Sequence, residues 1–88
     1  DGYIVDSMGW VHYQKGQYEK AVHYLEKAVE LVPDDPTILE HLADAYLKTN
    51  ARKAALNTYR KALENKEADK ASLEEKVRSL EQQLDSNP

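Results

Sequence analysis

The side chains in this sequence that could do chemistry are three histidines and a surplus of carboxylates. No two of the histidines, His12, His23 and His41, stand three or four residues apart, the spacing that places two metal ligands on one face of a helix. The sequence has no cysteine, no His-Glu-x-x-His pattern and no glycine-rich phosphate loop. We therefore expect no catalytic residue, no metal site and no cofactor.

The carboxylates do not indicate an active site either. Sixteen acidic residues face twelve basic ones, a net charge of −4. A catalytic carboxylate pair needs a pocket that shifts its pKa, and small helical hairpins seldom form one. An acidic surface also disfavours the phosphate backbone, and no apolar run approaches the roughly 20 residues of a membrane span. The sequence thus predicts a non-enzymatic protein that neither binds nucleic acid nor spans a membrane.

The elements that position these side chains are predicted to be helices. Apolar residues recur at helical spacing over residues 3–15, 18–32, 36–49 and 52–65. Gly16 and Asn50 suit a left-handed residue after a helix, Pro33 stops the second helix, and Asp35-Pro36 combines an N-cap with a proline in the first turn. Small residues at Gly9, Ala21 and Ala28 predict that the first two helices approach closely.

The sequence repeats itself with a shift of 34 residues (55 − 21). This shift superposes identical residues at Ile4 and Ile38, Ala21 and Ala55, Lys27 and Lys61, Ala28 and Ala62, and Glu30 and Glu64. A fixed period of this length is typical of a helical solenoid. Over residues 3–66 the sequence resembles the tetratricopeptide repeat family, whose ordered pattern of a large residue, Leu-Gly, Tyr, Ala-x-x-x-Phe and Pro it matches with substitutions. Departures are Val5 and Leu39 for Trp, His12 for Tyr, and Glu67 for the closing Pro.

This resemblance implies an all-α fold in which residues 1–35 and 36–68 form two repeat hairpins. Residues 69–84 are predicted to form a fifth helix with a narrow apolar stripe of Leu73, Val77, Leu80 and Leu84. The register (39 + 34 = 73) places Leu73 where Leu39 packs, so this helix is expected to cap the second repeat. The stripe is too short for a coiled coil.

The other faces of the fifth helix are polar, and we expect Lys76 and Arg78 to face solvent. Ser72 and Glu75 form a possible capping box at or inside its start. Residues 85–88 are predicted to be a frayed tail.

In the tetratricopeptide family, the first helix of each repeat lines a concave groove that binds the partner. By resemblance, the groove residues are Tyr3, Asp6, Ser7, Trp10, Tyr13, Gln14, Thr37, Glu40, His41, Asp44, Leu47 and Lys48. Family members that grip a chaperone's terminal carboxylate use Lys, Asn and Arg here, whereas these slots hold acidic and aromatic residues. Aromatic Trp10 and Tyr13 beside the like charges of Glu40 and Asp44 favour a basic or aromatic-rich peptide.

We therefore expect a non-catalytic module that binds a peptide or partner protein, as the C-terminal part of a larger scaffold or adaptor. The run Asp6-Ser-Met-Gly-Trp10 and the polar last helix are similar to the C-terminal repeats of bacterial multi-repeat proteins, some of them cell-envelope lipoproteins. One alternative is self-association through the last helix or an open N-terminal edge around Ile4 and Val11. Another is an accessory segment of an enzyme whose catalytic domain lies outside this sequence.

Overall fold

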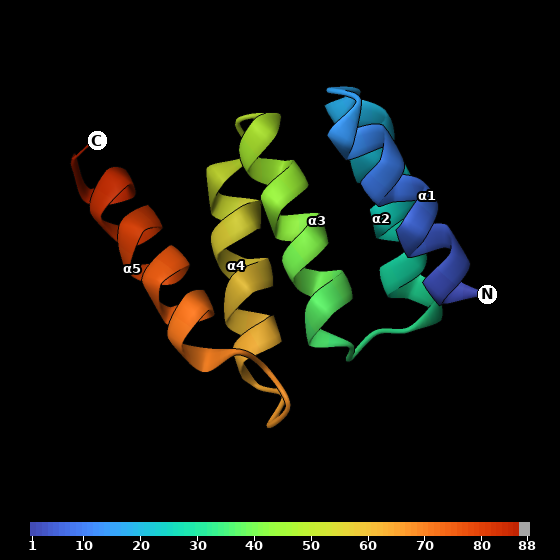
Figure 1. The fold of residues 1–88 in the computed structure, drawn as a ribbon. Helices are drawn as coiled ribbons and strands as arrows, with labels where there is room; N and C mark the ends of the chain where they lie inside the picture. The colour runs from blue at the N-terminus through green and yellow to red at the C-terminus, as the bar shows by residue number, and fades with distance from the viewer. Residues whose placement is uncertain (87–88) are drawn as a thin grey trace.

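The computed structural model describes residues 1–86, and its regular secondary structure there is helical throughout. The helices are α1 (Gly2–Gln14), α2 (Tyr18–Leu31), α3 (Pro36–Lys48), α4 (Arg52–Leu63) and α5 (Lys70–Ser86). Figure 1 shows two antiparallel hairpins, α1–α2 and α3–α4, set side by side, with α5 beyond the second hairpin and α1 at the opposite end of the row. The predicted all-α fold of paired helices is confirmed.

Capping residues mark the starts of α1 and α3, and left-handed residues mark the turns that follow these two helices. The Asp1 carboxylate accepts a hydrogen bond from the Ile4 backbone N–H at 3.0 Å. The Asp35 carboxylate caps α3 through the N–H groups of its first turn, and Pro36 is the first helical residue, as predicted. Gly16 and Asn50 adopt φ angles of 78° and 67°, the predicted left-handed conformation.

The bounds of α5 differ from the prediction. The Asp69 carboxylate accepts a hydrogen bond from the Ser72 N–H at 3.3 Å, so Asp69 caps this helix and Ser72 lies inside it. At the other end α5 continues through Asp85 and Ser86, which were expected in the tail, and the Ser86 hydroxyl donates to the Gln82 carbonyl at 2.8 Å. Residues 87–88 of the predicted tail lie outside the described residues.

The close approach of α1 and α2 occurs at Gly9. A Cβ atom at this position would lie 2.7 Å from Leu25 Cγ, so glycine is the residue that allows this contact. Ala21, Leu25 and Ala28 on α2 are completely buried. The prediction that small residues mark the contact between the two helices is confirmed.

The apolar core consists of two connected clusters. One joins α2 and α3 through Ala21, Leu25, Leu42 and Ala45. The other joins α3, α4 and α5 through Leu39, Ala43, Ala55, Leu56, Tyr59, Ala62, Leu73 and Leu80. Leu73 and Leu80 are almost fully buried, so α5 covers the second hairpin as the repeat register predicted.

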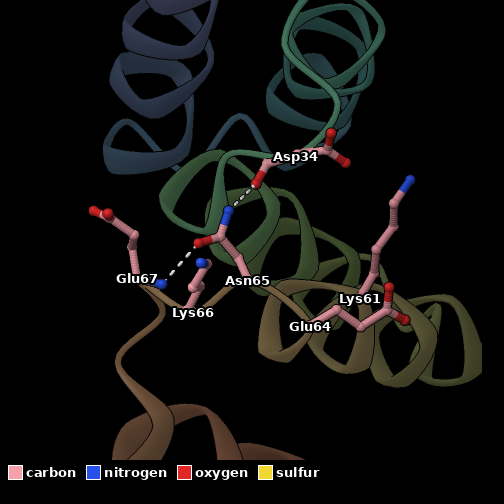
Figure 2. A pocket seen from close by; sticks show the side chains of 6 residues that line it. All are labelled: Asp34, Lys61, Glu64, Asn65, Lys66 and Glu67. Atoms are coloured by element: carbon pink, nitrogen blue, oxygen red, sulfur yellow. Dashed lines mark hydrogen bonds between the residues drawn. The ribbon is translucent and has the colours of Figure 1, made fainter.

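The turns that follow the two hairpins contact one another. The Asn65 side-chain amide donates to the Asp34 carbonyl at 2.8 Å, and its oxygen accepts from the Glu67 N–H at 2.8 Å. Figure 2 shows both bonds. The side chains drawn there line a polar hollow, which has a volume of about 430 Å³: Asp34, Lys61, Glu64, Asn65, Lys66 and Glu67. Asn65 thus stabilises the exit of the second hairpin, where Glu67 replaces the family's proline.

Candidate interaction surface

We call the groove residues predicted on the first helix of each hairpin the α1–α3 stripe: Tyr3, Asp6, Trp10, Tyr13, Gln14, Glu40, His41, Asp44, Leu47 and Lys48. The structure brings several of them into direct contact. The Trp10 ring stacks on Tyr13, with centroids 4.4 Å apart, and on His41 of the second hairpin at 4.1 Å. Tyr13 also meets the edge of Tyr18 at 5.3 Å, and Lys48 Nζ lies 5.6 Å from the Tyr18 ring centre.

Two contacts across this stripe connect the hairpins. His41 Nδ1 and Asp6 Oδ1 are 2.9 Å apart, with both side chains mostly buried. Because His41 also stacks on Trp10, one histidine of α3 is held by two side chains of α1. His41 thus lies beside Trp10 across the two hairpins.

The prediction that Trp10 favours a basic partner stays a prediction, but two rings of the chain itself already stack on the indole. Its neighbours lie nearly parallel to it, Tyr13 at 8° and His41 at 20°. Two rings within about 4.5 Å of one centroid would overlap if they shared a face, so we infer that Tyr13 and His41 cover opposite faces of the indole. Because Trp10 is still partly accessible, we infer that its edge is what remains open to a partner.

The acidic pair Glu40 and Asp44 is already occupied from within the chain. Lys76 of α5 was expected to face solvent, but its Nζ donates to Glu40 Oε2 at 2.7 Å and to Asp44 Oδ1 at 3.1 Å. The Tyr59 hydroxyl of α4 donates to the same Asp44 oxygen. Asp44 therefore connects three helices, and the repulsion predicted between the two carboxylates is relieved by Lys76. Arg78 does face solvent and pairs with Glu75 on its own helix.

Lys76 and Tyr18 are the residues of this surface that sequence reasoning missed. The repeat register contained a signal for Lys76, because a shift of 34 residues places it at the position of Leu42 and Met8. Leu42 packs against α2 of the preceding hairpin. A lysine at this position faces the preceding hairpin, so its charge has to be paired with a carboxylate of that hairpin. Glu40 and Asp44 of α3 are those carboxylates.

Burial and neighbouring carboxylates raise the pKa values of Tyr13, Tyr46 and Tyr59. Burial, then the hydrogen bond to Asp44, raises the pKa of the Tyr59 hydroxyl far above its usual range. Burial, then the hydrogen bond to Glu26, raises the pKa of Tyr46 to about 12. Burial, then the Asp44 charge, raises the pKa of Tyr13. For Lys76, burial lowers the pKa, but the bonds to Glu40 and Asp44 outweigh it and the pKa is raised.

These shifts predict that the protein loses stability at alkaline pH. A tyrosine whose pKa is raised on folding holds its proton more tightly in the folded chain than in the unfolded chain. Its contribution is complete below the unfolded pKa of about 10 and is lost as the pH rises toward the folded value. We therefore expect the free energy of unfolding, measured by urea titration, to be lower at about pH 11 than at about pH 9.

Tyr46→Phe provides the control for this experiment, since it removes one of the titrating hydroxyls. The variant is expected to lose less stability over the same pH interval. An identical loss in both proteins would assign the alkaline effect to other groups.

Only part of the stripe is exposed. Tyr3 is 58% exposed and Leu47 36%, and Gln14 and Lys48 are also exposed. The stripe can therefore contact a partner through aromatic edges, Leu47 and polar side chains.

Within residues 1–86 no group of three or more His, Asp or Glu side chains could hold a metal ion. No helix of this described part is long and apolar enough to cross a membrane.

Comparison with known families agrees with this architecture. A TPR repeat family matches residues 9–50, and a tetratricopeptide repeat family matches residues 36–69. Residues 9–69 thus match tetratricopeptide repeats, in agreement with the helical hairpins of the structure. Such repeats are typically protein-interaction modules and are usually non-catalytic. A search of the curated proteins finds no match to the chain.

Proposed function

We propose that this chain is a non-catalytic interaction module that binds a peptide or partner protein across the α1–α3 stripe, as part of a larger scaffold or adaptor. The observation that supports this proposal most is the stack of Tyr13, Trp10 and His41. Side chains held in place by their neighbours lose little conformational entropy when a partner binds. The partner therefore meets a surface that is already ordered.

The chemistry of the partner follows from what the stripe leaves open. Leu47 and the accessible edge of Trp10 favour an apolar or aromatic side chain. Glu40 and Asp44 would attract a basic one, but Lys76 already neutralises them in part. A basic partner thus has to compete with this lysine, while an aromatic contact does not.

Leu47→Asp tests the proposal, because Leu47 is an exposed apolar residue of the stripe and is not among the buried residues of the core. We expect the variant to melt like the original chain and to bind the partner at least about tenfold more weakly, since it places a charge in an apolar contact. Partners captured by the full chain would be identified by mass spectrometry and titrated by calorimetry.

Ile4→Asp is the matched control, because it makes the same kind of change at an exposed apolar residue of α1 outside the stripe. This variant should retain the partner. If Ile4→Asp abolishes binding and Leu47→Asp does not, the partner binds the N-terminal edge and the stripe assignment is wrong.

Self-association is a second candidate, favoured by a specific observation. Ile4, Met8 and Val11 of α1 are between 42% and 60% exposed. Their counterparts one repeat later, Ile38, Leu42 and Ala45, are buried. Sedimentation of the original chain over a range of concentrations would show a dimer that Ile4→Asp removes, whereas a monomer at every concentration excludes this candidate.

A further inference from the structure

Lys76 provides a contact that the capping of a helical repeat does not require. The Lys76 Nζ lies between Glu40 and Asp44, at 2.7 and 3.1 Å, and 5.5 Å from the centre of the Tyr59 ring. The Tyr59 hydroxyl completes this arrangement by donating to Asp44. Two carboxylates and an aromatic face are the groups that proteins use to bind an ammonium ion.

We call the carboxylates of Glu40 and Asp44 and the ring of Tyr59 the cage. All three groups come from the second hairpin, whereas the ammonium comes from outside it. Glu40 and Asp44 lie on α3 and belong to the α1–α3 stripe, and Tyr59 lies on α4. Their side chains are mostly buried, so a cation held here is only partly screened by water. The cage is therefore formed by the repeat itself, and α5 provides the occupant.

The rest of α5 is anchored by one apolar stripe. Its buried residues are Leu73 and Leu80, compared with five buried residues on α3. Its Glu81 pairs with Arg60 of α4 at 2.5 Å, but both side chains are about half exposed, and pairs of this kind contribute little. Val77 and Leu84 pack against the same core cluster, so this stripe anchors α5. Loss of Lys76 from its two carboxylates would loosen the helix without detaching it.

We propose that Lys76 is an intramolecular substitute for a partner's lysine, so that α5 controls access of a basic side chain to the stripe. This inference rests on the proposed function and adds a regulation of the same surface. One ammonium is bound by two carboxylates, so a partner's lysine and Lys76 compete for the same position. The apparent affinity for a basic peptide is then reduced by the fraction of time that Lys76 occupies the cage.

The experiment uses a dye-labelled peptide of eight lysines and measures its binding to the full chain by fluorescence anisotropy. Lys76→Met retains the length of the side chain and removes its charge. If Lys76 occupies the cage about nine-tenths of the time, the variant binds the peptide about tenfold more tightly. Arg78→Met is the matched control, because it makes the same change of charge on the exposed face of α5.

A second pair of variants assigns the gain to the cage. Adding Glu40→Gln and Asp44→Asn to Lys76→Met should abolish the gain, and adding them to Arg78→Met gives a protein of the same net charge for comparison. Equal binding by Lys76→Met and Arg78→Met would overturn the proposal, as would a gain that persists without the two carboxylates.

Hydrogen exchange on the unmodified chain tests the same competition without a substitution, and so remains decisive if a variant fails to fold. The peptide should accelerate exchange of the α5 amides and leave α1 and α2 unchanged. Unchanged or slower exchange in α5 would contradict the proposal. If Leu47→Asp still loses the partner, such a result overturns the regulation by Lys76 but not the proposed function of the stripe. The failure of one proposal can therefore be distinguished from the failure of the other.

Discussion

Truncation after Leu63 is expected to give a chain that aggregates or is partly unfolded, whereas truncation after Leu84 is expected to melt like the original. The first change removes Leu73 and Leu80, which are 1% and 2% exposed, and uncovers the Tyr59 side of α4. Burial of each leucine contributes about 1.5–3 kcal/mol, a large share of the roughly 5–15 kcal/mol that stabilises a typical domain.

Circular dichroism melting of both truncated chains, with light scattering to detect aggregates, checks this expectation. Truncation after Leu84 is the control, because Asp85 and Ser86 are exposed. Equal melting temperatures for the two chains would show that α5 is not needed to cover the second hairpin.

The sequence was sufficient for features that depend on a repeated register or on local backbone chemistry. The shift of 34 residues correctly placed Leu73 at the position of Leu39, and both are buried. Gly16 and Asn50 occupy equivalent turns and both adopt positive φ angles. Such features recur because each repeat places the same packing or backbone requirement on equivalent positions.

Contacts between hairpins were harder to predict, because they depend on which rotamers the long side chains adopt. Lys76 was placed on a solvated face by its polarity, yet it extends toward α3 because two carboxylates lie within its reach. Spacing predicts that Trp10 belongs to the stripe, but its stacking on Tyr13 and His41 follows from side-chain rotamers that no spacing rule specifies. The stripe therefore mixes residues that stabilise the repeat with residues open to a partner.

Tyr59→Ala is expected to destabilise the chain by about 3–5 kcal/mol, the usual cost of removing a large buried ring. Tyr59 is the largest of the fully buried side chains among residues 1–86, and it lies in the cluster that joins α3, α4 and α5. The substitution also removes the ring beside Lys76 and the hydroxyl bound to Asp44. Urea unfolding followed by circular dichroism measures the loss.

Tyr59→Phe separates the ring from the hydroxyl, because it retains the buried surface and removes only the bond to Asp44. We expect it to cost about 1 kcal/mol, since the net contribution of a hydrogen bond is modest and Lys76 still binds the carboxylate. The much larger loss in Tyr59→Ala would then come from the cavity. A loss in Tyr59→Phe as large as that in Tyr59→Ala would instead show that Asp44, and not apolar packing, is what joins these three helices.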